Sequence, residues 1–409
     1  MIPTNWRPWS PNSSSAASSP NIPISGGALM QTIRLRGVDP LLFRDGRPFA
    51  DELGAQRADS LPVPYPGVVA GAVRTAIGNA LGWDWKNGGP ARAQSPNVQG
   101  PVVCIGDGKP VVGAPADAVI YGKENDTSNP AQCMCLRPFK ELPNGWGCTM
   151  PEGLQPMQVT NEGKPEAGYV FWPWHRVMEW LGSPQGAGFQ VTDDLKIGRP
   201  ALEERTHVWI AEEGMLFTTA SVVPLERSWG KPEGKVERDW SYLVRVASDV
   251  DIEGPLFLGG ERRIAVAEKA GDAAWPKCPD ELAAKLKSAK RVRMLLVTPA
   301  IFSGGWMPGW VGGSPPGMEN LQLNLISACV PRREAVSGWN YAKRVPKAVR
   351  WLVPAGSVFF FEAEGDTSQL ASSAWLAPVS DDERDRRDGY GLAVWGVWDY
   401  HQAKEGGNG

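Results

Sequence analysis

The spacing of apolar residues predicts several regular elements. Apolar and arginine side chains alternate over residues 33–38, which is typical of a half-buried strand. Over residues 66–81 the apolar side chains recur on one helical face, and Arg74 lies off that face. The segments 172–181 and 279–290 predict two further helices.

The other periodic segments are of β type. They are short apolar runs, and they cover residues 214–223, 242–247, 292–299, 349–353, 358–361 and 392–398. Strands separated by helices and Gly-rich connections predict an α+β fold. They fit two small sheet-and-helix units better than one doubly wound domain, and we place the boundary near residue 290. Residues 85–165 show little periodicity, so we expect an irregular insertion there.

The composition predicts long loops, and the sequence argues against a membrane span. The 409 residues include 47 Gly and 37 Pro, and the 19 Trp outnumber the 11 Phe and 7 Tyr. No apolar run approaches the roughly 18 residues of a membrane span. Residues 1–29 are rich in Ser, Pro and Asn and lack the apolar centre of a signal peptide. We expect them to be a disordered leader of a cytoplasmic protein, with either Met1 or Met30 as the natural start.

The six cysteines do not resemble a secreted disulfide framework. Cys133, Cys135 and Cys148 have the start of a zinc-site pattern, but the paired knuckles of a strong zinc motif are missing. We therefore expect free thiols and no metal or other cofactor, with zinc binding as the alternative.

Charge is unevenly distributed along the chain. The formal net charge is −3, yet residues 282–361 hold eleven Lys and Arg against two Glu, a net +9 that leaves −12 elsewhere. This asymmetry favours a surface that faces a polyanion, although ordinary solvated lysines are the alternative. Aromatic residues interleave with the basic block, and single-stranded nucleic acid binds cationic grooves lined with aromatic faces. Trp306 and Trp310 lie in a Gly- and Pro-rich loop that can project them, whereas Trp351 lies in an apolar run and is expected in the core.

Three glycine-containing motifs could bind phosphate groups. Residues 39–49 place Arg44 and Arg47 around a glycine, and residues 258–263 place Arg262 and Arg263 after two glycines. Arginine donates paired hydrogen bonds to phosphate, and glycine lets a backbone approach closely. The alternatives are an Arg44–Asp45 surface pair and a solvated arginine pair at a turn. The third motif, residues 389–396, lacks the Lys and Ser/Thr of a nucleotide-triphosphate loop.

These motifs also occur in a family order. The chain resembles the RAMP superfamily of CRISPR proteins, and in particular the type III-B (Cmr) effector subunit with two ferredoxin-like domains. The segments that carry the resemblance are, in chain order, 39–49, 197–217, 258–263, 297–306, 353–359 and 389–396. Residues 1–29 and most of 85–165 have no counterpart in this pattern. The resemblance implies tandem ferredoxin-like (RRM-like) domains with long loops at 30–290 and 291–409, and no catalytic residues.

The resemblance further implies a subunit that holds the 5′ tag of the CRISPR RNA (crRNA) in antiviral defence. Its implied partners are a polymerase-like large subunit and backbone RAMP subunits, with target RNA contacted indirectly. We expect RNA contacts from Arg44, Arg47, Arg205, His207, Arg262, Arg263, Trp306, Lys343, Arg344, Gly389, Gly391 and Gly396.

Two other classes of function remain as alternatives. Some RAMP proteins are metal-independent endoribonucleases that process precursor crRNA, and such chemistry usually needs a histidine acid or base. Only His175, His207 and His401 exist, and no two are close in sequence, so we expect no enzyme activity. The Trp content could suit a carbohydrate enzyme or binder, but no recognisable pair of carboxylates supports it.

Overall fold

The computed structural model describes residues 29–45, 56–122, 131–140, 150–151, 153–158, 164–186, 188–208, 216–227, 236–340 and 345–400. Residues 1–28 of the expected leader lie outside this described part, and its last residue, Leu29, begins a strand. Also outside it lie Arg47, Cys148, Lys343, Arg344, His401 and the side chain of His207.

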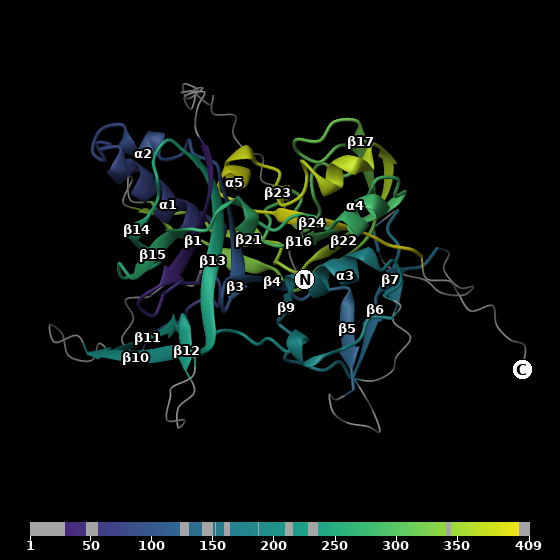
Figure 1. Cartoon of the computed structure of the whole chain (residues 1–409), viewed down its shortest axis with the longest axis horizontal. Helices are drawn as coiled ribbons and strands as arrows, with labels where there is room; N and C mark the ends of the chain where they lie inside the picture. The colour runs from purple at the N-terminus through teal and green to yellow at the C-terminus, as the bar shows by residue number, and fades with distance from the viewer. Residues whose placement is uncertain are drawn as a thin grey trace, which may run out of the picture.

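The first sheet has eight strands and holds most of the N-terminal half of the chain (Figure 1). The order is β14-β15-β1-β13-β3-β4-β9, with β12 paired to β13. The strands are β1 (Leu29–Gly37), β3 (Val98–Ile105), β4 (Lys109–Gly113), β9 (Phe171–Pro173), β12 (Leu225–Arg227), β13 (Val236–Ser248), β14 (Gly254–Phe257) and β15 (Ile264–Lys269). Helix α1 (Pro66–Ala80) follows β1 and covers one face, where Val69 and Val73 pack with Ile33 and Leu35.

The second sheet has five strands in the order β17-β22-β16-β24-β23. They are β16 (Arg291–Leu296), β17 (Leu321–Cys329), β22 (Val358–Gly365), β23 (Ala377–Pro378) and β24 (Leu392–Val397). Helices α3 (Trp174–Gly182) and α4 (Asp280–Leu286) precede this sheet in the chain and pack against β24. The short helices η3 (Thr367–Ala371) and α5 (Glu383–Arg387) connect β22 to β24.

Both sheets share one strand order at their centres. Numbered along the chain within each sheet, β15-β1-β13-β3 and β24-β16-β22-β17 both run 4-1-3-2, and all neighbouring strands are antiparallel. This is the order of a β-α-β-β-α-β ferredoxin-like unit. Each unit lacks one crossover helix, because β14 replaces the second helix of the first unit and a loop over residues 297–320 replaces the first helix of the second. The predicted α+β class is confirmed.

The remaining elements are a small sheet, four strand pairs and three short helices. The small sheet consists of β10 (Leu202–Val208), β11 (Leu216–Val222) and β2 (Gln56–Ala58). The strand pairs are β18 (Glu334–Val336) with β21 (Arg350–Leu352), β19 (Trp339–Asn340) with β20 (Val345–Pro346), β5 (Ala118–Tyr121) with β6 (Gln132–Cys135), and β7 (Arg137–Pro138) with β8 (Met157–Gln158). The helices are α2 (Gly89–Arg92), η1 (Asp193–Leu195) and η2 (Asp272–Ala274).

The expected insertion is wrong in part. Residues 98–113 form β3 and β4 inside the first sheet, and β3 pairs with the long strand β13. Val98, Val102 and Cys104 are fully buried there. Gln99, Gly100 and Pro101 interrupt the apolar run of β3, and Gly and Pro usually indicate a turn, so the sequence pattern did not reveal this strand.

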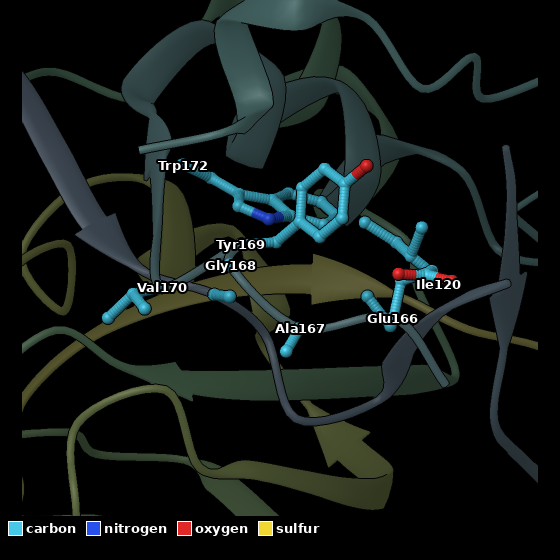
Figure 2. Close-up of a pocket in the computed structure, with 9 residues that line it drawn as sticks. Ile120, Glu166, Ala167, Gly168, Tyr169, Val170 and Trp172 are labelled. Atoms are coloured by element: carbon cyan, nitrogen blue, oxygen red, sulfur yellow. The ribbon is translucent and has the colours of Figure 1, made fainter. Parts of the chain in front are cut away.

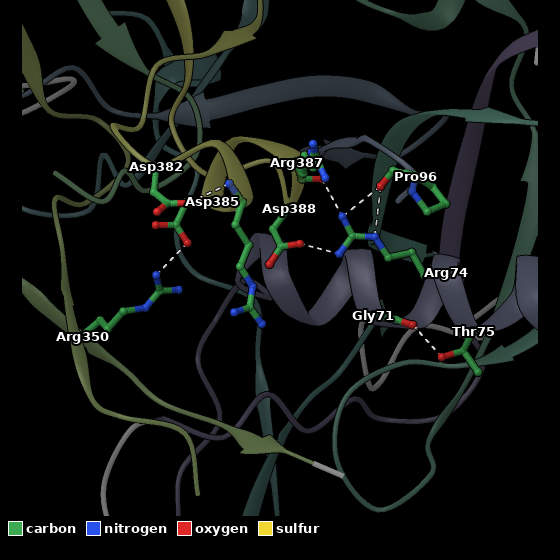
Figure 3. A network of polar contacts seen from close by, with 10 residues as sticks. Gly71, Arg74, Thr75, Pro96, Arg350, Asp382, Asp385, Arg387 and Asp388 are labelled. Carbon is green, nitrogen blue, oxygen red and sulfur yellow. Dashed lines mark hydrogen bonds and ion pairs between the residues drawn. The ribbon is translucent and has the colours of Figure 1, made fainter. Parts of the chain in front are cut away.

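The two units share apolar and polar contacts. Val102 and Leu243 of the first sheet lie in one apolar cluster with Met294 and Phe359 of the second. Arg74, which the helical pattern placed off the apolar face, is only 8 % exposed. Its guanidinium forms an ion pair with Asp388 after α5, and it donates to the carbonyl oxygens of Pro96 (3.0 Å from Nε) and Arg387 (2.9 Å) (Figure 3). Arg74 therefore links α1 to the second unit.

One ion pair lies completely inside the protein. The side chains of Arg293 on β16 and Asp117 just before β5 are both 0 % exposed, and Nη1 lies 2.6 Å from Oδ2. The indole of Trp180 donates to the other oxygen of Asp117 at 2.9 Å, and Arg293 also donates to the carbonyl oxygens of Trp180 and Ser183. This network fixes α3 against the second sheet.

Candidate nucleic-acid interface

Two of the arginine motifs lie against each other. The Gly260 N–H donates to the carbonyl oxygen of Leu42 at 2.7 Å, which holds residues 258–263 against residues 39–45. Leu41 exchanges two backbone hydrogen bonds with Val222, so the hairpin of β10 and β11 joins the same region. The fold therefore brings three segments of the sequence into one region, which carry Arg44, Arg205 and the consecutive pair Arg262 and Arg263.

The turn over residues 258–263 has an uncommon backbone. Gly259 has a φ of +84°, and a Cβ there would lie 2.5 Å from the carbonyl oxygen of Leu42, so the position needs glycine. Glu261 and Arg262 also have positive φ values, both +53°. Such strain is concentrated at functional sites in proteins. The exposed guanidinium of Arg262 lies over the Phe257 ring, 5.0 Å from its centroid.

Carboxylates engage the neighbouring arginines. Arg263 bonds to Glu261 at 2.8 Å and its side chain is only 16 % exposed. Arg205 bonds to Glu203 at 2.6 Å, and this hydrogen bond is the main reason that the pKa of Arg205 is raised. Arg44 forms a backbone bridge with Ser60. Arg262 is exposed, and its guanidinium has no carboxylate partner among the described residues.

The glycine motif does not support the expected RNA contact, because its three glycines are buried. A Cβ on Gly389 would lie 2.5 Å from the carbonyl oxygen of Gly100 in the first sheet. A Cβ on Gly391 would lie 2.8 Å from Ser380 Oγ, and one on Gly396 would lie 2.5 Å from the Leu181 carbonyl oxygen. We correct the prediction accordingly: these glycines allow close packing inside the chain.

The basic block is less cationic at the surface than its sequence indicates. Arg293 is buried with Asp117, Arg291 pairs with Asp399 at 2.5 Å, and Arg350 pairs with Asp385 at 2.7 Å. The exposed cations of the block that the structure describes include Lys287, Lys290, Arg332, Arg333 and Lys347.

The tryptophans of the block separate into inward and outward side chains. Trp306 is 37 % exposed in a loop that Asp381 holds by accepting from the Ser303 N–H (2.7 Å) and the Gly309 N–H (2.9 Å). Trp310 turns inward and donates to the Val379 carbonyl oxygen at 2.8 Å. The prediction that Trp351 lies in the core is wrong, because it is 49 % exposed. Arg333 lies over its ring at 4.1 Å from the centroid.

The described residues contain no cluster of three or more metal-ligating side chains. Burial raises the pKa of the Cys135 thiol to about 12, which makes it a poor source of thiolate. His175 is exposed beside Asp194 at 3.4 Å. An open cavity of about 190 Å³ lies beside Ile120, Glu166, Tyr169 and Trp172 (Figure 2), which is smaller than the roughly 300–1,000 Å³ typical of small-molecule sites.

Comparison with known proteins identifies the family. Residues 33–398 match the family described as CRISPR-associated protein (Cas_Cmr3), which is nearly the whole described chain. The chain belongs to this family. The resemblance to Cmr subunits of the RAMP type is thereby confirmed. No curated protein matches the sequence.

Solved structures of type III complexes show distant similarity. A chain of the type III-B Cmr-beta complex bound to cognate target RNA is 14 % identical, with 81 % of this chain and 86 % of that chain covered and a TM-score of 0.38. A chain of the Csm3–Csm4 subcomplex of the type III-A interference complex is 9 % identical, with 82 % and 94 % covered and a TM-score of 0.33. Scores this low do not bear on function. Within the described part of the chain, no helix has the length and hydropathy needed to cross a membrane.

Proposed function

We propose that this chain is a non-catalytic RNA-binding subunit of a type III-B CRISPR effector complex. In this role it holds the 5′ tag of the crRNA and docks a polymerase-like large subunit and a backbone RAMP subunit. The observation that carries the proposal is membership of the Cas_Cmr3 family over residues 33–398. The geometry adds a second argument: the strained turn over residues 258–263 presents the guanidinium of Arg262, a group that can bind phosphate.

Arg262 is the side chain through which we test RNA binding. Arg262→Ala is expected to weaken binding of a tagged crRNA about ten-fold and to make the salt dependence of log K shallower by about one unit, because one phosphate contact is lost. Fluorescence anisotropy with a labelled crRNA across a salt series measures both. Lys277→Ala, which removes an exposed cation away from the turn, is the control and should bind like wild type. Unchanged affinity and slope in Arg262→Ala would remove Arg262 from the RNA site.

The absence of catalysis is a separate part of the proposal. Purified protein incubated with repeat RNA in EDTA is expected to leave the RNA intact over hours. Cleavage without metal needs a general acid and a general base, and the proposed function assigns neither role to a residue of this chain. Denaturing gels of the RNA measure the outcome. Site-specific cleavage that disappears in His207→Ala would instead establish the metal-independent endoribonuclease.

A further inference from the structure

The strand pair β18–β21 forms a small ribbon with two different faces, and its strand β21 lies near the centre of Figure 1. One face packs on the protein, where Val336 and Leu352 are 8 % and 1 % exposed in a cluster with Tyr65 and Tyr390. Glu334 also turns to this side and accepts a hydrogen bond from Tyr65 Oη at 3.2 Å. The packed face therefore anchors the ribbon at the junction of the two units.

The other face points to solvent and carries an aromatic–cation pair. Ala335 is the cross-strand partner of Trp351, so Arg333 is the diagonal neighbour of that indole on the same face. The guanidinium carbon of Arg333 lies 4.1 Å from the centroid of the Trp351 ring. Trp351 is 49 % exposed and the adjacent Val349 is 55 % exposed. We call this face, made of Arg333, Val349 and Trp351, the ribbon platform.

The surroundings of the ribbon platform are cationic. Arg332 and Lys347 are exposed next to it. The acidic residue of the ribbon, Glu334, faces Tyr65, and Asp385 is held by Arg350 on the packed side (Figure 3). None of the three residues of the platform is acidic, so an anionic ligand meets no repulsion from them.

We propose that the ribbon platform binds single-stranded RNA by stacking an unpaired base on the Arg333–Trp351 pair. Nucleobases stack both on indole rings and on the guanidinium plane of arginine, and neighbouring cations hold the phosphates. The cationic surroundings favour RNA over an apolar protein partner as the occupant. The inference rests on the proposed RNA-binding function, and it adds a base contact in the second unit to the phosphate contact of Arg262 in the first.

The test separates stacking on bases from attraction to phosphates. The full-length chain is titrated with a labelled single-stranded oligoribonucleotide and with the same backbone carrying abasic sites. Trp351→Ala is expected to weaken binding of the normal oligonucleotide about ten-fold and to leave binding of the abasic one unchanged. Trp351→Phe should keep most of the affinity. Arg333→Lys retains the charge but not the planar group, so it should lose base-dependent binding while keeping the salt slope. Lys287→Ala is the control for charge, since Lys287 is exposed in the same block but outside the ribbon.

Several outcomes overturn the inference. If Arg262→Ala weakens RNA binding and Trp351→Ala does not, the platform is no RNA site while the proposed function stands. If wild type binds neither oligonucleotide, both fail. If Trp351→Ala disrupts assembly with the partner subunits at unchanged RNA affinity, the platform is a protein contact. Urea unfolding of each variant checks that it is folded.

Discussion

Asp117→Ala is expected to lower the free energy of unfolding by about 3–5 kcal/mol, the largest effect of a single substitution that we predict. The loss leaves the guanidinium of Arg293 charged inside the protein with carbonyl oxygens as its remaining strong acceptors. It also removes the acceptor of the Trp180 indole N–H. Urea unfolding followed by tryptophan fluorescence measures the change.

The same strand supplies a matched control for this prediction. Arg291, two residues before Arg293 on β16, pairs with Asp399, and both side chains are 38 % exposed. Asp399→Ala should cost less than about 1 kcal/mol, because water screens this pair. The double variant Asp117→Leu/Arg293→Met removes both buried charges and should recover much of the stability that Asp117→Ala loses. Equal effects of Asp117→Ala and Asp399→Ala would contradict the role assigned to burial.

Gly396→Ala is expected to destabilise the protein by about 3 kcal/mol, at the upper end of overpacking effects. Gly396 lies in β24, opposite Arg293 of β16, where helix α3 crosses the sheet. An added Cβ would lie 2.5 Å from the Leu181 carbonyl oxygen and 2.7 Å from its Cβ, and Leu181 is fully buried. Backbone and core have to shift to make room, and urea unfolding measures the cost.

A second glycine variant provides the comparison. Gly71 lies in the middle of α1 with no atom within 4 Å of an added Cβ, so Gly71→Ala should stabilise the protein by up to about 1 kcal/mol. The comparison also distinguishes packing from ligand binding at Gly396. A Gly396→Ala variant as stable as wild type that binds crRNA poorly would restore the glycine motif to the RNA site.

Helical spacing and short apolar runs predicted several elements correctly and missed other strands, among them β3 and β17. The predicted helix over 66–81 corresponds to α1, the predicted strand at 292–299 overlaps β16, and the one at 392–398 contains β24. Strand β3 was missed because Gln99, Gly100 and Pro101 interrupt its apolar run, and Gly and Pro are typical of turns. Strand β17 does alternate, with Leu321, Leu323 and Leu325 buried, so it could have been predicted from the sequence and was missed.

The candidate site required the tertiary structure for a different reason. The pattern along one strand tells which side chains share a face, but not whether another element covers that face. Trp351 lies in an apolar run and still points to solvent, because the opposite face of its ribbon is the one that packs. Arg74 and Arg293 read as surface cations, yet each is buried with a carboxylate.

From the sequence alone come the α+β class, three of the α-helices, some of the strands, and the order of motifs that resembles the RAMP superfamily. These are properties of local patterns, which neighbouring residues encode. Which charges remain at the surface depends on the fold. Asp117 lies 176 residues from Arg293, and Asp388 lies 314 residues from Arg74. Whether a guanidinium meets a carboxylate or solvent depends on such distant partners, and so the set of cations exposed to solvent is a property of the folded chain.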